Sequence, residues 1–246
     1  MNESVELSVL MPAYNEESII VNSIKTVSEI LNNQKINYEI IVIDDGSSDN
    51  TYEKAKSLNY PNVIVAGYKK NAGKGRALKY GFNYASGKYV IFYDSDLEIS
   101  PYLINEFLKA IKAKNVDIVV GSKWLENSKI EYPLMRKILS LSYHIMLKVL
   151  FQINIRDTQV GIKIFKKDSL GRIFPYVETI KYSTDIEILA LASMFNFSVS
   201  EIPVEIKLDN KHSHIKLKNI AAMFIDTLQI FYRLKISNEI KKKLKS

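Results

Sequence analysis

The feature that most constrains the fold of this chain is a regular alternation of apolar stretches and segments with helical spacing. Apolar stretches lie at residues 7–11, 38–43, 62–66, 89–94 and 116–120. Residues 18–31 carry apolar side chains three and four positions apart, and another helix is expected to run through Ala85. Strands that alternate with helices predict parallel βαβ units. We therefore expect an α/β fold with a mostly parallel, Rossmann-like central sheet flanked by helices.

Each of the first four predicted strands closes on a polar loop. The loop sequences are PAYNEE at 12–17, DDGSSD at 44–49, NAGKG at 71–75 and DSDLE at 94–98. In parallel sheets, ligands bind in the crevice outside the carboxyl ends of the strands. The four loops are therefore expected to converge on one binding site.

The last of these loops carries two carboxylates one residue apart, Asp94 and Asp96. At the end of a strand, both can turn toward the same crevice. Mg²⁺ or Mn²⁺ bound to phosphates typically uses only one or two carboxylates. This pattern predicts a divalent-metal site, with Glu98 as a third ligand. The alternative is an acidic turn before a helix capped by Ser100 and Pro101.

The other loops favour a nucleoside diphosphate over a dinucleotide. No G-x-G-x-x-G follows the first strand and no P-loop motif occurs, so dehydrogenase and P-loop chemistry are unsupported. Asp44 and Asp45 offer acceptors to a base or ribose. The Gly73-Lys74-Gly75 segment offers N–H groups and an ammonium group to phosphate. Taken singly, each loop also reads as an ordinary turn or helix entry.

The net charge of +7 is unevenly placed along the chain. Residues 207–246 hold ten basic and three acidic side chains, whereas residues 1–206 hold 24 of each. A basic tail suits an anionic surface, either nucleic acid or lipid headgroups, although a solvated helix end gives the same pattern. Aromatic and basic residues are not interleaved, so no nucleic-acid partner is expected. There are no cysteines, and the first residues do not resemble a signal peptide.

Two apolar runs, residues 138–155 and 219–236, are candidates for membrane contact. The first holds His144, Lys148, Gln152 and Asn154, so it is a poor spanning segment. We expect amphipathic helices lying at a membrane interface, with helices packed on the domain as the alternative. Two apolar helices followed by a polybasic tail fit two-signal peripheral attachment.

The loop motifs, in this order, resemble the catalytic domain of family-2 inverting glycosyltransferases of the GT-A fold. The second half of the chain strengthens the likeness. Residues 121–123 (GSK), 156–165 (RDTQVGIKIF), 184–189 (TDIEIL) and 201–204 (EIPV) resemble segments of dolichyl-phosphate glucosyltransferases. The resemblance runs from about residue 6 to about residue 236. It implies one GT-A domain over 1–236, with a nucleotide-sugar half to about 122, an acceptor half beyond it, and a basic tail at 237–246.

The resemblance implies a metal-dependent hexosyltransferase at the cytoplasmic face of a membrane. A glucose or mannose would move from UDP-glucose or GDP-mannose to dolichyl or polyprenyl phosphate, with Mg²⁺ or Mn²⁺ as cofactor. The donor nucleotide would be bound by Pro12, Tyr14, Glu16, Asp44, Asp45, Gly73, Lys74, Asp94 and Ser95. The acceptor phosphate would be bound by Lys123, Arg136, Ser140 and Lys163. The catalytic set would be Asp94, Asp96, Asp185 and Glu187.

The sequence also departs from the family pattern and leaves alternatives open. Lys123 stands where the family usually has arginine, and residues 207–214 lack the small segment expected after EIPV. A relative that extends an oligosaccharide or polysaccharide would need a base for a hydroxyl acceptor, and Asp185 or Glu187 would serve. A non-catalytic nucleotide-sugar-binding subunit is the alternative outside enzymes.

Overall fold

A seven-stranded sheet forms the centre of the computed structural model, which describes residues 4–125, 134–179, 183–205, 217–237 and 240. Side chains at 134–141 and 217–222 are not described. The strand order is β3-β2-β1-β4-β6-β5-β7. The strands are β1 (Leu7–Ala13), β2 (Tyr38–Asp44), β3 (Val63–Gly67), β4 (Tyr89–Phe92), β5 (Ile118–Ser122), β6 (Lys163–Lys166) and β7 (Val199–Pro203).

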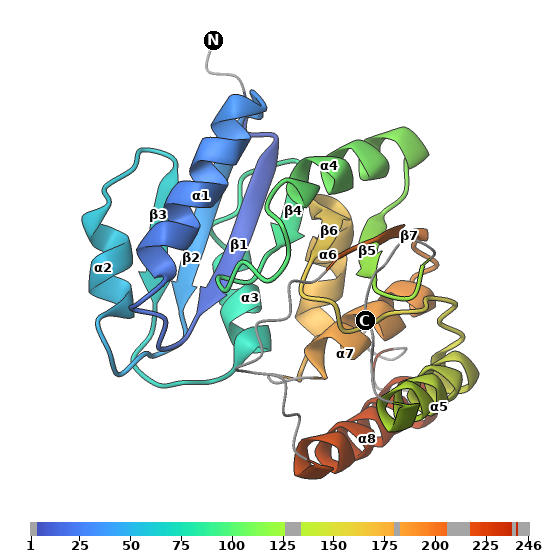
Figure 1. Cartoon of the computed structure of the whole chain (residues 1–246). Helices are drawn as coiled ribbons and strands as arrows, with labels where there is room; N and C mark the ends of the chain where they lie inside the picture. Colours follow the sequence, from blue (N-terminus) through green and yellow to red (C-terminus); the bar gives the residue numbers. More distant parts are fainter. Residues whose placement is uncertain (1–3, 126–133, 180–182, 206–216, 238–239, 241–246) are drawn as a thin grey trace.

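Helices cover both faces of this sheet (Figure 1). One face carries α1 (Ile20–Asn33), α2 (Thr51–Ser57) and α4 (Leu103–Lys114). The other face carries α3 (Lys74–Phe82), α6 (Lys167–Ile173) and α7 (Thr184–Met194), with a short 3₁₀ helix at Phe174–Tyr176. This mostly parallel α/β sandwich confirms the predicted fold class.

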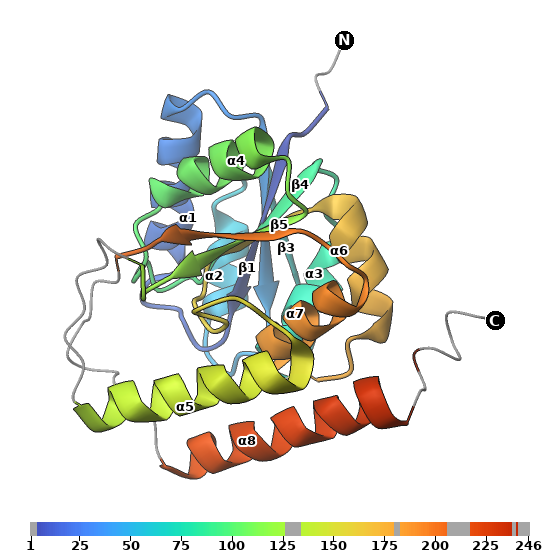
Figure 2. The same cartoon turned by 90° about the vertical axis from the view of Figure 1, so that its right-hand side faces the viewer.

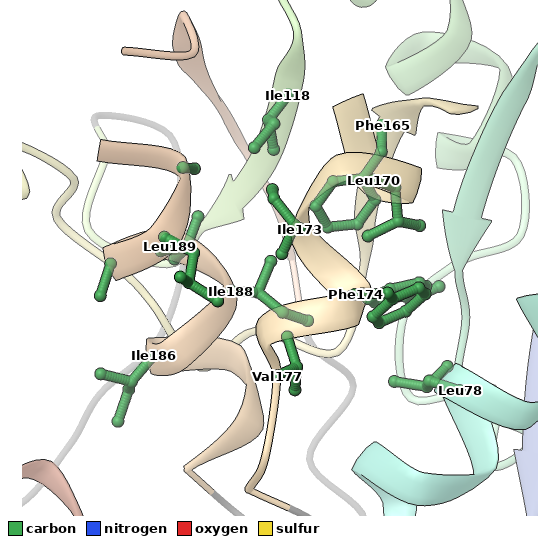
Figure 3. Packing of buried hydrophobic residues seen from close by; sticks show 14 of the residues in the cluster. Leu78, Ile118, Phe165, Leu170, Ile173, Phe174, Val177, Ile186, Ile188 and Leu189 are labelled. Atoms are coloured by element: carbon green, nitrogen blue, oxygen red, sulfur yellow. The ribbon is translucent and has the colours of Figure 1, made fainter. Parts of the chain in front are cut away.

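The alternation of side chains along the strands divides the core into two clusters. On β2, Ile41 and Ile43 belong to the cluster under α3, α6 and α7, while Ile40 and Val42 belong to the cluster under α1 and α4. Successive side chains of a strand point to opposite faces, so a strand covered on both sides is apolar throughout. Figure 3 shows how α6 and α7 interlock in the first cluster, with Ile173 and Ile188 between them.

The strand β6 is the exception to parallel pairing. It runs antiparallel to both of its neighbours, β4 and β5, while β5 pairs with β7 in parallel. In this register Lys163, the first residue of β6, lies opposite Phe92, the last residue of β4. The start of β6 therefore lies at the same edge of the sheet as the carboxyl ends of β1 to β4.

Several boundaries differ from the sequence prediction by about two residues. β1 continues through Pro12 to Ala13, because those two residues stay in register with Ile43 and Asp44 of β2. β4 ends at Phe92, before the first carboxylate. α4 begins at Leu103, and Ser100 belongs to a preceding turn that accepts a hydrogen bond from the Leu103 N–H (3.0 Å).

The two apolar runs form a pair of neighbouring helices, α5 (Leu134–Phe151) and α8 (Leu217–Phe231), the second continuing as a π-helical turn over Tyr232–Ile236. Figures 1 and 2 both show the pair beyond the edge to which β1 and β2 point. The helices run in the same direction, because Tyr143 contacts Phe224 (ring centroids 5.0 Å apart) and Phe151 contacts Phe231 (5.9 Å). Within the described part of the chain, neither these helices nor any other is long and apolar enough to cross a bilayer.

Candidate active site

The first two loops interlock at the carboxyl edge of the sheet. Asn15, in the left-handed region at φ 56°, donates its N–H to Ser47 Oγ (2.9 Å), and its side-chain oxygen accepts the Ser48 N–H (2.8 Å). The Glu17 N–H donates to Asp49 Oδ2 (3.1 Å). These bonds join PAYNEE and DDGSSD into one ledge, which carries the predicted donor residues Pro12, Tyr14, Glu16 and Asp44.

Asp45 lies behind this ledge and is almost fully buried. Its carboxylate accepts hydrogen bonds from Tyr68 Oη (2.6 Å), Gly73 N (2.8 Å), Ala72 N (2.9 Å) and Asn71 Nδ2 (3.1 Å). Asp45 therefore holds the third loop, NAGKG at 71–75, in its conformation. The N–H groups of Ala72 and Gly73, at the entry to α3, point to Asp45. Burial and the Asp45 carboxylate together raise the pKa of Tyr68 well above its usual range.

The Asp94-Ser95-Asp96 turn follows β4. Ser95 is buried, and its carbonyl accepts a hydrogen bond from Ser23 Oγ on α1 (2.5 Å). With Ser95 held inside, Asp94 and Asp96 both line one cleft. Asp96 Oδ1 accepts the Glu98 N–H (3.0 Å) across Leu97, which has a left-handed φ of 56°. The predicted convergence of the two carboxylates is thus present in the fold.

Lys74, the first residue of α3, reaches this turn. Its Nζ lies 2.5 Å from Asp94 Oδ1, and both side chains are about one-third exposed, 36% and 34%. Burial lowers the pKa of Lys74, but the neighbouring carboxylates Asp94, Asp185 and Asp96 raise it, and the net direction is upward. For Asp96, the cleft walls displace hydration and Asp94 adds a like charge, so its pKa is raised.

The cleft encloses about 170 Å³ and is lined by both acidic and basic side chains. It is lined by Tyr93, Asp94, Asp96, Glu98, Ile99, Lys123, Gln159, Val160, Gly161 and Ile162. Lys123 comes from the end of β5, and its Nζ lies 3.7 Å from Asp157 Oδ2. The cleft therefore connects the carboxylate turn with the segment that was predicted to bind the acceptor.

Gly161 lines the same cleft and lies directly beside Asp94. A Cβ at this position would lie 2.3 Å from Asp94 Oδ2, closer than real contacts allow. Sequence reasoning noticed the DTQVG segment but did not place Gln159 or Gly161 in the site. The missing information was the antiparallel insertion of β6 beside β4, which brings this loop to the carboxylate turn.

Lys163 and Asp185 form an ion pair inside the domain. Lys163 is 1% exposed, and its Nζ lies 2.9 Å from Asp185 Oδ1 and donates to the Val160 carbonyl (2.6 Å). Asp185, 16% exposed, is in the first turn of α7. The Lys163 ammonium group thus binds Asp185 and the Val160 carbonyl. The sequence analysis expects it to bind the acceptor phosphate instead.

Glu187 follows Asp185 by two residues and therefore lies on a different side of α7 from Asp185. It is fully buried, accepts the N–H groups of Thr179 (2.7 Å) and Glu178 (3.1 Å), and forms an ion pair with Arg233. Asp185 raises the pKa of Lys74, which itself contacts the carboxylate turn. Glu187 is not among the groups that shift this pKa. Glu187 is placed to hold the segment before α7.

The helix α8 and its π-helical extension support α7 from outside. Asp226 accepts a hydrogen bond from Ser183 Oγ (2.8 Å), immediately before α7. Arg233 pairs with Glu187 and with Glu178 (3.0 Å), and donates to the Tyr176 carbonyl (3.1 Å). The other two predicted acceptor residues, Arg136 and Ser140, belong to α5, but their side chains lie outside the described part.

A divalent cation fits the carboxylate turn as a two-carboxylate site. Among the described residues, no three acidic or histidine side chains are arranged to hold a metal ion. Glu98 lines the cleft but does not complete such a trio with Asp94 and Asp96. Two carboxylates suffice for Mg²⁺ or Mn²⁺ when phosphate oxygens supply other ligands. Burial and the neighbouring Asp94 charge raise the pKa of Asp96, and the cation would offset the second of these effects.

A comparison with protein-family models shows to which family the chain belongs. The pattern described as "Glycosyl transferase family 2" matches residues 8–174, more than half of the chain. The chain belongs to glycosyl transferase family 2. The resemblance drawn from the loop motifs is confirmed.

Curated relatives agree with this assignment, and a solved structure shares the fold. A dolichyl-phosphate beta-glucosyltransferase of Trichomonas vaginalis is 34% identical over 247 residues, covering 94% of this chain and 75% of the relative. One of Saccharomyces cerevisiae is 30% identical, covering 82% and 67%. The glucosyl-3-phosphoglycerate synthase of Mycobacterium tuberculosis, solved with Mn²⁺, UDP-glucose and phosphoglyceric acid, superposes with a TM-score of 0.70 at 20% identity, covering 93% of this family-2 chain and 79% of that chain.

Proposed function

We propose that this protein transfers a glucosyl group, with inversion, from UDP-glucose to dolichyl or another polyprenyl phosphate at the cytoplasmic face of a membrane. The observation that carries the proposal is a cleft lined by both acidic and basic side chains. Asp94 and Asp96 are among the acidic ones, and Lys123 is the basic one. The choice of glucose and of a lipid phosphate is supported by relatives named dolichyl-phosphate beta-glucosyltransferase that align with most of the chain.

The donor side requires a cation. Mg²⁺ or Mn²⁺ would be held by Asp94 and Asp96, and when bound it would neutralise the charge that develops on the leaving nucleotide. Lys74 adds a positive charge beside the same turn. The ledge formed by PAYNEE and DDGSSD would bind the base and ribose through Asp44 and Pro12. The Asp44 carboxylate is buried and accepts the Ser47 N–H (3.3 Å). Asp45 contributes by fixing the loop that carries Lys74.

The acceptor side needs charge rather than a strong base. A phosphate monoester has its second pKa at about 6, so it is largely dianionic at neutral pH. One of its oxygens attacks C1 of the sugar, the C1–O bond to the diphosphate breaks, and UDP leaves. Lys123, which lines the cleft with its Nζ 3.7 Å from Asp157 Oδ2, would hold the attacking phosphate by a charge-assisted hydrogen bond. Arg136 and Ser140, four residues apart on α5, share a helix face and extend the proposed phosphate site.

The structure favours this acceptor over a sugar hydroxyl. A hydroxyl acceptor needs a positioned general base. Glu187 is fully buried and bound to Arg233, and the Asp185 carboxylate is already paired with Lys163. Polysaccharide extension is therefore the weaker candidate.

Attachment to a membrane is proposed from the outer face of α5 and α8. On α5, Ile145 and Val149 are 52% and 73% exposed and lie one turn apart. On α8 and its extension, exposed apolar side chains recur at three- and four-residue spacing: Ile225, Leu228, Tyr232 and Ile236. Two neighbouring apolar stripes followed by a basic tail match an amphipathic surface on anionic lipid.

A donor and acceptor screen tests the proposal. The purified chain would be incubated with UDP-glucose or GDP-mannose, dolichyl phosphate and Mn²⁺ or Mg²⁺, and the lipid-linked sugar would be quantified. We expect the product only with UDP-glucose. Faster transfer to a free sugar hydroxyl than to dolichyl phosphate would overturn the acceptor, and product from GDP-mannose alone would overturn the donor.

A further inference from the structure

The contact between Lys74 and Asp94 points to a role for Lys74 beyond binding the donor's diphosphate. We propose that Lys74 is a built-in counter-cation, which occupies Asp94 before the donor arrives and moves to the donor's diphosphate when a nucleotide and a divalent cation bind. Lys74 thereby makes metal binding depend on nucleotide binding. The inference rests on the proposed function, because it assumes a metal-bound nucleoside diphosphate at this turn.

The backbone of Lys74 is fixed, so only its side chain can change partner. The preceding Gly73 has φ 95° and donates its N–H to the buried Asp45. The following Gly75 packs directly on α7, where a Cβ would lie 2.0 Å from Thr184 Oγ1. The first turn of α3 is therefore held between Asp45 and Thr184, with the ammonium group at the edge of the cleft.

The two oxygens of Asp94 have different neighbours. Oδ1 lies 2.5 Å from Lys74 Nζ, and Oδ2 lies beside Gly161, where an added Cβ would be 2.3 Å from it. The Asp96 and Asp185 carboxylates also act on Lys74, so the ammonium group lies within a set of negative charges. A divalent cation that approaches Asp94 alone must displace this ammonium group. The competition weakens metal binding in the absence of nucleotide.

A nucleoside diphosphate changes the balance, because it offers Lys74 a new anionic partner. Asp94 is then free for the metal, and the diphosphate oxygens complete its ligand set. Nucleotide and metal consequently bind with positive coupling, and each raises the affinity of the other by the same factor. Such couplings typically amount to about 5- to 150-fold. We expect Lys74 to carry most of this factor.

The test is a titration with Mn²⁺ by calorimetry, without nucleotide and at saturating UDP, so that catalysis is not the readout. In the wild type, UDP should strengthen Mn²⁺ binding by at least about fivefold. In Lys74→Met, Mn²⁺ alone should bind tighter than to the wild type, and the additional effect of UDP should shrink. Lys74→Gln should behave in the same way, and thermal unfolding of both variants shows that they are folded.

Lys123→Met is the matched control for a general effect of charge. Lys123 lines the same cleft and carries the same charge, but its ammonium group is directed to Asp157 and not to Asp94. If the competition is direct, Lys123→Met should change Mn²⁺ binding much less than Lys74→Met. An equal gain in both variants would show a diffuse field effect and would overturn the inference.

Two further outcomes separate the inference from the proposed function. If the wild type shows coupling but Lys74→Met leaves the affinity for Mn²⁺ alone unchanged or weaker, the counter-cation role is wrong while the donor site stands. If the wild type binds no Mn²⁺ even with UDP, the metal-dependent donor site is wrong, and the inference falls with it.

Discussion

The ammonium group of Lys163 and the carboxylate of Asp185 lie 2.9 Å apart, joining the start of β6 to the first turn of α7. The pair is nearly excluded from water, since Lys163 is 1% exposed. A buried ion pair recovers its desolvation cost only while both partners are present. Asp185 also acts on Lys74, so the pair fixes one side of the charge cluster around the carboxylate turn.

Removing Lys163 should therefore destabilise the fold. We expect Lys163→Met to lower the free energy of unfolding by about 3–5 kcal/mol, because Asp185 is left without its partner. Lys166→Met is the control on the same strand. Lys166 forms a pair with Asp117 at 3.8 Å in which the side chains are 31% and 25% exposed, and its loss should change stability by no more than about 1 kcal/mol. Urea unfolding measures both. Equal losses of unfolding free energy in the two variants would show that the buried Lys163–Asp185 pair contributes no more to stability than the Lys166–Asp117 pair.

A second prediction concerns Gly161. In Gly161→Ala the new Cβ would meet Asp94 Oδ2 at 2.3 Å, so the carboxylate must shift. A misplacement of about 1 Å in a catalytic site can reduce the rate by about 100-fold. We expect a loss of that order in sugar transfer, with little change in thermal stability.

Gly171→Ala on α6 is the matched control for Gly161→Ala. Its Cβ would meet only Phe82, at an ordinary 3.6 Å. Replacing a helical glycine by alanine typically stabilises by about 0.5–1 kcal/mol, and activity should be retained. Full activity of Gly161→Ala would remove the DTQVG loop from the immediate surroundings of the carboxylate turn.

The third prediction concerns the metal. Asp96→Asn removes one of the two carboxylates proposed to hold the cation. It also removes a negatively charged group whose pKa is raised by burial and by the neighbouring Asp94. Transfer should fall to background, whereas the thermal transition of the metal-free protein should stay nearly unchanged. Excess EDTA should also abolish activity in the wild type. Sustained turnover in EDTA would refute the metal assignment.

The sequence was sufficient to predict the parallel half of the sheet and the loops at its edge. Continuous apolar strands and polar loop residues are local signals, and they predict that Asp94 and Asp96 lie together at the end of a strand. The structure confirms this arrangement because β1, β2 and β4 are neighbours in parallel register.

The acceptor half was harder to predict because its residues meet through long-range pairing. Nothing near Lys163 in the sequence indicates that β6 enters the sheet antiparallel, or that Asp185, 22 positions later, neutralises it. Likewise, Asp45 reads as a ligand-binding acid until its four hydrogen-bond donors are known. A carboxylate that binds the protein and one that binds a ligand have the same local sequence.

The fourth prediction tests the acceptor side with Lys123. A charge-assisted hydrogen bond to the acceptor phosphate contributes about 1.5–3 kcal/mol. Lys123→Ala should therefore raise the apparent KM for dolichyl phosphate by about 10- to 150-fold, with donor affinity little changed. Arg136→Ala should act in the same direction. Steady-state kinetics at saturating donor measure both.

Arginine substitution supplies the control for Lys123. Lys123→Arg keeps the positive charge and restores the residue usual in the family, so it should preserve acceptor binding. If Lys123→Ala and Lys123→Arg lose acceptor affinity equally, the effect comes from disturbed packing near Asp157 and not from the lost charge. Unchanged kinetics in Lys123→Ala would remove it from the acceptor site.

The last prediction concerns the outer face of α5 and α8. Val149 and Leu228 are 73% and 54% exposed on neighbouring helices, and burying an aliphatic side chain in lipid contributes about 1.5–3 kcal/mol. The double variant Val149→Asp, Leu228→Asp should therefore lose most of its binding to anionic vesicles, measured by co-sedimentation. Tyr84→Asp, at an exposed aromatic position at the end of α3, should bind like the wild type.

Salt separates the apolar contribution from the charged one in the same assay. Charges at a surface are screened over about 8 Å at physiological ionic strength, so high salt should release part of the wild type. Deleting residues 241–246, which hold four lysines and follow the buried Ile240, should reduce this salt-sensitive part and leave the apolar part, because the stripes on α5 and α8 remain. The double aspartate variant should show the reverse, with weak residual binding that salt abolishes. A wild-type chain that ignores both anionic and neutral vesicles would refute peripheral attachment, since neither the stripes nor the tail would then contact lipid.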